Sequence, residues 1–146
     1  MYLLKYILFF FVISANAAEY RILAHEIATE YKISGALLTS ICEVESNWNP
    51  RAIGDDGLSI GLCQIKVTTA LNEVGKSWYS SKPYHWRYNH MYKLLLQPEY
   101  NLRMAARLLR RYSDMFGGDE TMMLIAYNGG PNNKLIIYIN KVRKKM

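Results

Sequence analysis

Residues 34–50 read SGALLTSICEVESNWNP and contain the pattern that decides the fold. Ser34 is a typical N-cap residue for a helix that runs to Glu45. The pair Asn49-Pro50 ends this helix, because a proline disfavours the helical conformation of the residue before it. Three residues spaced seven, four and three positions before Glu45 share its face: Leu38, Ile41 and Cys42. We expect this apolar stripe to face the core, so Glu45 lies where a buried helix face ends.

This position gives Glu45 an unusual chemistry. No Lys or Arg stands at the helical spacings that would let a cation neutralise its carboxylate. Partial desolvation raises the pKa of a carboxyl group and makes it a candidate proton donor near neutral pH. Glu43 is rotated away from the stripe, and we expect it to be a solvated surface charge.

The first 17 residues differ in composition from the rest of the 146-residue chain. Lys5 is the single charge before an apolar run at 6–13, and Ala15-Asn16-Ala17 follows it. This pattern predicts a secretory signal peptide over 1–17 that is cleaved near Ala17. A membrane anchor is the alternative, but spanning a bilayer takes about 20 apolar residues. We therefore expect one exported domain over 18–146, periplasmic or secreted, with no membrane span after cleavage.

Basic residues are in excess. The whole chain has a net charge of +6, and loss of Lys5 leaves 17 Lys and Arg against 12 Asp and Glu. The excess lies in arginines between 103 and 111 and in the tail 141–145. A basic exported protein is attracted to anionic polymers such as the cell wall, although a solvated helix face and a frayed end explain the same charges. Few aromatic residues alternate with these charges, so a nucleic-acid partner is not expected.

Two cysteines, Cys42 and Cys63, lie in the predicted mature domain. In an oxidising compartment they could form a disulfide, which would contribute roughly 3 kcal/mol of stability in the chain-entropy model. Two buried thiols are the alternative, and the core-facing position of Cys42 slightly favours it. The three histidines do not have metal-ligand spacing, so neither a metal nor a cofactor is expected.

Helical patterns dominate the mature chain and predict a mainly α fold without internal repeats. The predicted helices, one of them a short helical turn, lie at 19–32, 34–45, 67–71, 99–112, 119–126 and from 135 on. The turn-rich segment 54–61 predicts a small β-hairpin or an irregular loop. Residues 75–92 predict a long irregular stretch with six Trp and Tyr side chains. These rings could form sugar-stacking walls of a cleft or cover the core, and we expect a minority of them to contact a ligand.

Three segments together resemble motifs of the lytic transglycosylase family. Residues 45–50 (ESNWNP) resemble its Glu-Ser motif, and residues 61–65 (GLCQI) resemble Gly-Leu-Met-Gln-Ile with Cys63 in place of Met. Residues 126–131 (AYNGGP) resemble Ala-Tyr-Asn-x-Gly-Pro, and the helix around 98–102 is similar to the segment before this motif. The interval 57–61 is one residue longer than the usual family form, so the local loop shape should differ.

The resemblance implies a lysozyme-like fold and cleavage of the β-1,4 bond between N-acetylmuramic acid and N-acetylglucosamine in peptidoglycan. Glu45 would protonate the leaving oxygen and then act as a base on the C6 hydroxyl, which closes a 1,6-anhydro ring. The family's cleft residues correspond to Ser46, Gln64, Tyr127 and Asn128. Among them, we expect Tyr127 to hydrogen-bond Glu45 or the reacting sugar. For Gln64 and Asn128 the alternative roles are structural: satisfying buried backbone and ending a helix.

Two other functions remain open from the sequence. A hydrolytic, lysozyme-like muramidase would use Asp55 or Asp56 to position water, although Asp is also expected in a turn for conformational reasons. A non-catalytic wall-binding or cationic membrane-active protein is the second alternative. Small exported members of the family often serve a secretion, conjugation or pilus assembly or a phage, so such an envelope-spanning partner is a further expectation.

Overall fold

The computed structural model describes residues 2–75, 78–129 and 135–146, and it describes side chains from residue 16 on except those of 76–79 and 130–134. Helices dominate it, which confirms the mainly α prediction. The α-helices are α1 (Tyr2–Glu30), α2 (Gly35–Ser46), α3 (Val67–Val74), α4 (Tyr84–Leu95), α5 (Pro98–Met115), α6 (Glu120–Tyr127) and α7 (Leu135–Lys145). None of the helices that the structure describes has the length and apolar character needed to cross a membrane.

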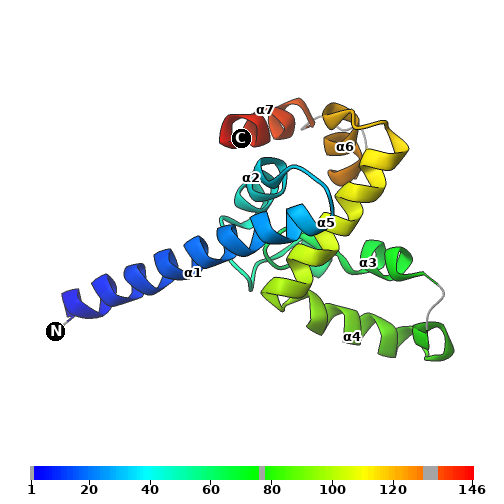
Figure 1. The fold of residues 1–146 in the computed structure, drawn as a ribbon. Coiled ribbons are helices and arrows are strands. Elements are labelled where there is room, and N and C mark those ends of the chain that lie inside the picture. The colour runs from blue at the N-terminus through cyan, green and yellow to red at the C-terminus, as the bar shows by residue number, and fades with distance from the viewer. Residues whose placement is uncertain (1, 76–77, 130–134) are drawn as a thin grey trace.

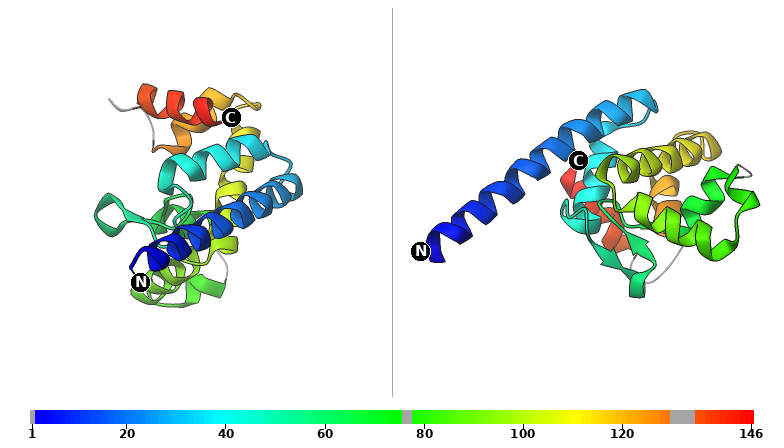
Figure 2. Two further views of the ribbon diagram at one scale, coloured as in Figure 1. Left: turned by 90° about the vertical axis from the view of Figure 1, so that its left-hand side faces the viewer. Right: turned by 90° about the horizontal axis from the view of Figure 1, so that it is seen from below.

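The long helices α1, α2 and α5 enclose the core. The C-terminal half of α1 packs against α2 and α5, while its N-terminal half projects away from the other elements (Figures 1 and 2). Fully buried side chains from all three helices meet there, because each helix has an apolar face: Ile27, Leu38, Ile41, Leu102 and Leu109. Helix α7 lies beside α2 at the opposite end of the molecule from α4 (Figure 1).

Helix α2 begins as its sequence predicts, but Asn47 ends it before the predicted stop at Asn49-Pro50. The Ser34 hydroxyl accepts a hydrogen bond from the Leu37 backbone N–H at 3.1 Å, which satisfies a donor that the helix leaves unpaired. At the other end, Asn47 adopts the left-handed conformation with a φ of 51°. The helix therefore stops one residue after Glu45, and the side chain of Glu45 lies in its last turn.

A small antiparallel sheet lies in the region where the sequence predicts a hairpin. Its strands are β1 (Ile53–Gly54), β2 (Ser59–Ile60) and β3 (Ile65–Lys66), in the order β1-β2-β3. The pairings Ile53 with Ile60 and Ile60 with Ile65 set the register. A 3-10 turn, η1 (Asp55–Gly57), connects β1 and β2. The hairpin is thus the first part of a three-stranded sheet whose last strand leads directly into α3.

The prediction of an irregular stretch over 75–92 is wrong for most of its described part. Residues Trp78–Ser81 form a 3-10 turn, η2, and α4 starts at Tyr84 directly after Pro83. Helix formation here follows from apolar residues four apart, Met91 and Leu95, which are fully buried where α4 packs against α3 and α5. The many aromatic residues obscured this helical spacing in the sequence.

The arginines of α5 are paired with carboxylates instead of forming a free basic surface. Arg103 pairs with Glu30 and Glu99, and Arg110 pairs with Asp114. Arg107 and Arg111 both bind Glu73 on α3, at N–O distances of 3.0 and 3.1 Å. Helix α5 therefore uses its charge to fix α1 and α3, and much of the basic excess seen in the sequence is neutralised internally.

Candidate active site

A cavity of about 580 Å³ lies between the sheet and helices α3, α5 and α6. Its volume falls within the range of typical ligand-binding pockets. Its lining includes four of the predicted site residues: Glu45, Gln64, Tyr127 and Asn128. It also includes Asp55, which a hydrolytic muramidase would use to position water. Residues from 45 to 69 and from 108 to 129 thus meet around one hollow, which brings parts of all three motifs together.

Glu45 is the half-buried carboxyl group of this cavity. Burial raises its pKa from 4.5 to about 7, and the negative charge of Asp55 acts in the same direction. The hydroxyl of Tyr138 opposes this shift by stabilising the charged form. At neutral pH a substantial fraction of Glu45 is therefore protonated and faces the cavity, which is the state that a general acid needs.

Tyr138 is a site residue that sequence reasoning missed. It lies on α7, is 9% exposed, and directs its hydroxyl toward Glu45, although no hydrogen bond of standard geometry joins them in the described structure. Burial, together with the nearby charge of Glu45, raises the pKa of Tyr138, so its hydroxyl stays protonated. Its position beside Ile139 and four residues before Val142, both buried, was the available signal for an inward-facing hydroxyl.

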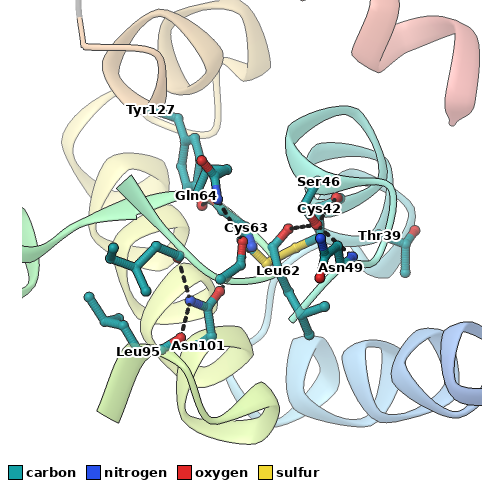
Figure 3. The surroundings of a disulfide bond; sticks show 12 residues. Thr39, Cys42, Ser46, Asn49, Leu62, Cys63, Gln64, Leu95, Asn101 and Tyr127 are labelled. Atoms are coloured by element: carbon teal, nitrogen blue, oxygen red, sulfur yellow. Dashed lines mark hydrogen bonds between the residues drawn. A yellow bond between two sulfur atoms is a disulfide. The ribbon is translucent and has the colours of Figure 1, made fainter. Parts of the chain in front are cut away.

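Tyr127 reaches the same region from the end of α6. Its hydroxyl donates a 2.8 Å hydrogen bond to the Cys63 carbonyl oxygen, so in this structure the hydroxyl proton is directed to the backbone and not to Glu45. Burial raises the pKa of Tyr127 well above its ordinary value, with a further contribution from the charge of Glu45. Tyr127 thus connects α6 to the turn between β2 and β3 while its ring lines the cavity (Figure 3).

Cys42 and Cys63 form a disulfide, with Cα atoms 4.1 Å apart (Figure 3). The slight preference for two free thiols was therefore wrong. A core-facing position did not exclude a bond, because both sulfur atoms lie in the same fully buried layer. The bond joins α2, three residues before Glu45, to the residue that precedes Gln64. The disulfide thus links the helix that leads into the first motif to the second motif.

Gln64 holds the turn that carries it. Its side-chain amide donates to the carbonyl oxygens of Ala52 at 3.1 Å and Gly61 at 3.0 Å, and its backbone is left-handed with a φ of 47°. Gly54 permits this arrangement, because a Cβ atom there would lie 2.4 Å from the Gln64 amide oxygen. The structural role foreseen for Gln64 is present, and the residue also lines the cavity.

Asn101 on α5 is a second residue that the sequence analysis did not single out. It is completely buried, accepts a 2.9 Å hydrogen bond from the Cys63 N–H, and donates to the carbonyl oxygens of Ile60 and Leu95 at 2.8 Å each (Figure 3). A Cβ atom at Gly61 would lie 2.3 Å from the Asn101 amide nitrogen. Asn101 therefore fixes the GLCQI turn against α5, and Gly61 provides the space.

Ser46 and Asn128, both predicted to line the cleft, differ in whether they reach the cavity. The Ser46 hydroxyl donates to the Leu62 carbonyl oxygen at 2.6 Å, and it is absent from the described lining of the cavity. Asn128 follows the last residue of α6 and lines the cavity. The last two residues of the third motif, 130 and 131, lie outside the described residues. Ser46 thus joins the first motif to the second, and Asn128 contributes to the cavity wall.

Asp55 and Lys66 form an ion pair at the cavity wall. Asp55 has a left-handed backbone with a φ of 49°, accepts a 2.7 Å hydrogen bond from the Ser59 hydroxyl, and lies 3.8 Å from the Lys66 ammonium group. Asp55 and Lys66 both line the cavity and are exposed. A carboxylate other than Glu45 is therefore available to a bound molecule. Asp56, its neighbour in the sequence, is not among the described lining residues.

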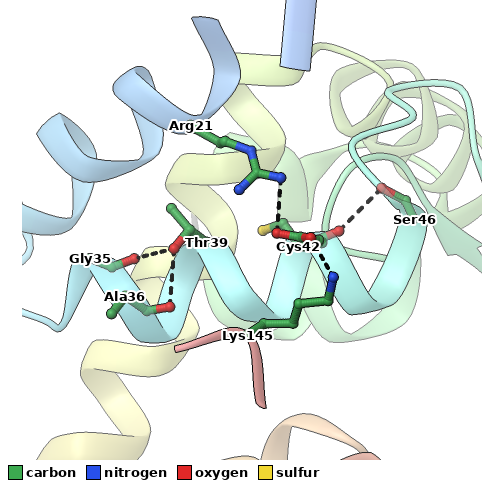
Figure 4. Close-up of polar contacts among 8 residues, drawn as sticks. Arg21, Gly35, Ala36, Thr39, Cys42, Ser46 and Lys145 are labelled. Atoms are coloured by element: carbon green, nitrogen blue, oxygen red, sulfur yellow. Dashed lines mark hydrogen bonds and ion pairs between the residues drawn. The ribbon is translucent and has the colours of Figure 1, made fainter. Parts of the chain in front are cut away.

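Glu43 differs from its prediction. Its side chain is 15% exposed and forms ion pairs with Arg21 of α1 at 2.9 Å and Lys145 of α7 at 2.8 Å. Figure 4 shows the two cations approaching α2 from different sides. The Lys145 hydrogen bond is the main reason why the pKa of Glu43 is lowered. Glu43 is thus a structural clamp and not a solvated surface charge.

No group of three or more His, Cys, Asp or Glu side chains that could hold a metal ion occurs in the part of the chain with described side chains. The described side chains at the cavity offer a partly protonated carboxyl, Glu45, and an exposed carboxylate paired with a lysine, Asp55 with Lys66. The hydroxyls of Tyr127 and Tyr138 lie nearby.

Comparison with known proteins assigns this arrangement to a class. The model of the transglycosylase SLT domain matches residues 22–145. The chain is 27% identical over 139 residues to the membrane-bound lytic murein transglycosylase C of Photorhabdus laumondii, covering 88% of this chain and 36% of that protein. The fold is the lysozyme-like one of the lytic transglycosylases, and the chain belongs to the transglycosylase SLT family.

Solved structures agree in fold. The 70 kDa soluble lytic transglycosylase SLT70 of Escherichia coli superposes with a TM-score of 0.56 at 25% identity, covering 83% of this chain and 19% of that one. An inactive Glu-to-Gln mutant of the lytic transglycosylase Slt from Pseudomonas aeruginosa superposes with a TM-score of 0.60 at 20% identity, covering 84% and 20%. The chain spans about a third of its curated relative and a fifth of these larger enzymes.

Proposed function

We propose that the chain is a peptidoglycan lytic transglycosylase that cleaves the β-1,4 bond between N-acetylmuramic acid and N-acetylglucosamine and leaves a 1,6-anhydromuramic acid end. Membership in the SLT family and the names of its relatives support the reaction class. The observation that carries the proposal for this chain is Glu45, a half-buried carboxyl with a pKa of about 7 that lines the same cavity as Gln64 and Tyr127.

In the proposed reaction Glu45 acts twice. As an acid it donates its proton to the glycosidic oxygen, and the bond to the muramic acid C1 breaks. As a carboxylate it then accepts the proton of the C6 hydroxyl on the same sugar, whose oxygen forms the new bond to C1. Because the nucleophile belongs to the substrate, its high effective concentration replaces a second catalytic carboxylate.

The surrounding residues have supporting roles in this proposal. Tyr138 stabilises the charged form of Glu45 between the two steps, since its hydroxyl already lowers the pKa of that carboxyl. Gln64, Tyr127 and Asn128 contact the glycan from the cavity wall. Ser46 acts indirectly by holding the end of α2 against the GLCQI turn.

Hydrolysis is the second candidate, and one observation favours it: Asp55 lines the same cavity as Glu45. Glycosidases that use water need two carboxyl groups about 5 to 9.5 Å apart, one on each side of the scissile bond. Against this role, Asp55 is already engaged by Ser59 and Lys66. Its carboxylate would have to release these partners to position water.

Mass analysis of the products separates the two candidates. Purified sacculi are digested with the protein, and the masses of the soluble muropeptides are measured by mass spectrometry without prior reduction. We expect products one water lighter than those of a hydrolase, because ring closure replaces water addition. Products that all carry the added water would show that the protein is a muramidase, and undigested sacculi would show that it is a binding protein.

The proposed setting follows from the substrate. We propose that residues 1–17 are a signal peptide and that the domain over 18–146 acts in the periplasm or outside the cell. The projecting N-terminal half of α1 supports the first point (Figure 1). Association with an envelope-spanning secretion, conjugation or pilus assembly remains part of the proposal, tested by whether such an assembly fails in a deletion strain.

A further inference from the structure

Lys66 brings a positive charge into the active-site cavity. It is the last residue of β3 and directly precedes α3. Among the described lining residues it is the only Lys or Arg, whereas two carboxyl groups, Glu45 and Asp55, line the same cavity. The acid–base chemistry proposed for Glu45 gives this cation no role.

The ammonium group of Lys66 is available to a ligand. It lies 3.8 Å from the Asp55 carboxylate, farther than the roughly 2.7–3.2 Å of a hydrogen bond. The hydrogen bonds of the described structure include none that this ammonium group donates. Both side chains are more than half exposed, at 51% and 59%, so solvent screens their attraction. A carboxylate of a bound molecule can therefore displace Asp55, which keeps its 2.7 Å hydrogen bond from Ser59.

The start of α3 favours an anion at the same place. Lys66 occupies the N-cap position of this eight-residue helix, and its side chain makes no capping hydrogen bond. A helix N-terminus carries a partial positive charge. Thr69, in the first turn of α3, lines the cavity together with Lys66. The helix terminus and the ammonium group thus attract a bound carboxylate in the same direction.

The proposed substrate carries a carboxylate close to its reacting bond. Muramic acid, whose C1 would react beside Glu45, bears a lactyl side arm on C3 of the same ring. This arm ends in a free carboxylate where a strand has lost its peptide, and elsewhere it is joined to a peptide with carboxylates of its own. N-acetylglucosamine has no such arm. A cation in the cavity that receives the muramic acid ring can therefore distinguish the two sugars.

We propose that Lys66 is a specificity-determining residue that binds a carboxylate on the lactyl side arm of muramic acid, either that of the arm itself or that of the attached peptide. This inference rests on the proposed function, because it assumes muramic acid beside Glu45. The contact favours muramic acid over N-acetylglucosamine at this position, and it takes no part in breaking the glycosidic bond.

Binding of matched glycans to the full chain carrying Glu45→Gln, which prevents digestion, tests the proposal. The probes are soluble peptidoglycan strands and the same strands with their carboxylates converted to carboxamides. The parent should bind the carboxylate form about fivefold more tightly, the effect of one ion pair at a half-exposed site. Lys66→Gln should abolish this preference, and Lys66→Arg should retain it because the charge remains.

Lys141→Gln on α7 is the matched control. It removes the same charge from an exposed lysine that is absent from the described lining of the cavity, so it should keep the parental preference. Melting temperatures check that every variant folds. With Glu45 intact, Lys66→Gln should raise KM on the carboxylate strands about fivefold and change kcat less than about twofold.

Strands stripped of peptide by an amidase identify the source of the carboxylate. If Lys66→Gln abolishes the preference for carboxylate over amidated strands in this stripped form too, the lactyl carboxylate is the partner. If it does so only in strands that keep their peptides, the partner is a peptide carboxylate. Chitin oligosaccharides, which have no side arm, should bind equally to the parent and to Lys66→Gln.

Three results would overturn the proposal: a parent that does not distinguish carboxylate from amidated strands, a Lys66→Gln variant that keeps the parental preference, or an equal loss in Lys141→Gln. A preference that depends on Lys66 in a protein that releases no muropeptides would support this contact and refute the proposed function. Release of anhydro products by Lys66→Gln with the parental KM would support the proposed function and refute this inference.

Discussion

Glu43 and Glu45 lie two residues apart on α2, yet the structure gives them opposite properties. Glu43 faces the two ends of the chain, where Arg21 and Lys145 hold it as an anion and its pKa is lowered. Glu45 faces the cavity, where burial raises its pKa to about 7. Helix geometry separates the two side chains by about 200° around the axis. The same residue type is thus a clamp on one face of α2 and an acid on the other.

The comparison shows that partners, and not the residue type, decide the function of each carboxyl. Glu43 connects α1, α2 and α7, and α7 in turn carries Tyr138 to the cavity side of α2. The clamp therefore helps to define the surroundings of the acid.

Replacing the acid should have the largest effect. Glu45→Gln is expected to lower the release of muropeptides by about a thousandfold, because the amide cannot donate a proton to the leaving oxygen. Turnover is measured by the solubilisation of labelled sacculi. Glu43→Gln is the matched control on the same helix and should keep most of the activity. A Glu45→Gln variant that keeps more than a tenth of the parental rate would contradict the role of Glu45 as the general acid.

The disulfide comes next. The double variant C42A/C63A should have a free energy of unfolding about 3 kcal/mol lower than that of the parent, because the bond closes a loop with a sequence separation of 21. For a domain of this size this corresponds to a melting temperature about 10 °C lower. Calorimetry with and without a reductant measures the melting temperatures of both proteins. The reductant should lower the melting temperature of the parent but not that of the double variant. A parent that is insensitive to the reductant would count against a stabilising bond.

Loss of the Tyr138 hydroxyl should have an intermediate effect. Tyr138→Phe removes the group that lowers the pKa of Glu45, so that pKa should rise and the alkaline limit of activity should move to higher pH. The rate should fall by about tenfold, because the charged form of Glu45 loses a nearby hydroxyl that stabilises it. The pH profile of sacculus digestion measures both effects. Tyr31→Phe, which lies outside the cavity lining, is the control, and an equal profile in the two variants would refute the role of Tyr138.

The clamp should give the smallest effect. Glu43→Gln is expected to cost less than about 1 kcal/mol at pH 7 and low salt, because its partners Arg21 and Lys145 are about half exposed and solvent screens such pairs. Because the folded pKa of Glu43 is lowered, this stabilisation exists above the unfolded value of 4.5 and disappears as pH falls below it. Denaturant titrations of Glu43→Gln and the exposed control Glu26→Gln at pH 7 and pH 3 measure the difference. A cost that grows in acid would have the wrong sign.

Local signals predicted the part of the site that lies on α2. The cap at Ser34, the apolar stripe and the Pro50 stop placed Glu45 at the end of a buried face, and the motif order brought Gln64, Tyr127 and Asn128 to the same cavity. The mainly α fold and the small sheet followed from periodicity and turn residues. These features depend on neighbours within a few positions.

Contacts between distant segments explain what the sequence did not predict. Arg21 and Lys145 reach Glu43 from positions 22 residues before it and 102 residues after it, so spacing along α2 could not reveal them. Asn101 serves a turn that lies 38 residues earlier in the chain. Tyr138 lies in the apolar stripe of α7, so the pattern did not distinguish it from a core residue. The aromatic residues of α4 obscured its helical spacing. Tertiary packing decided each of these cases.

The pKa of Glu45 is the central quantity. Its side-chain carboxyl can be followed by carbon-13 NMR during a pH titration of the free protein, with Glu45→Gln used to assign the signal. We predict a midpoint at about pH 7 for Glu45 and one below 4.5 for Glu43. A midpoint for Glu45 at or below 4.5 would mean that the carboxyl is ionised at neutral pH, and it would contradict the role of Glu45 as the acid.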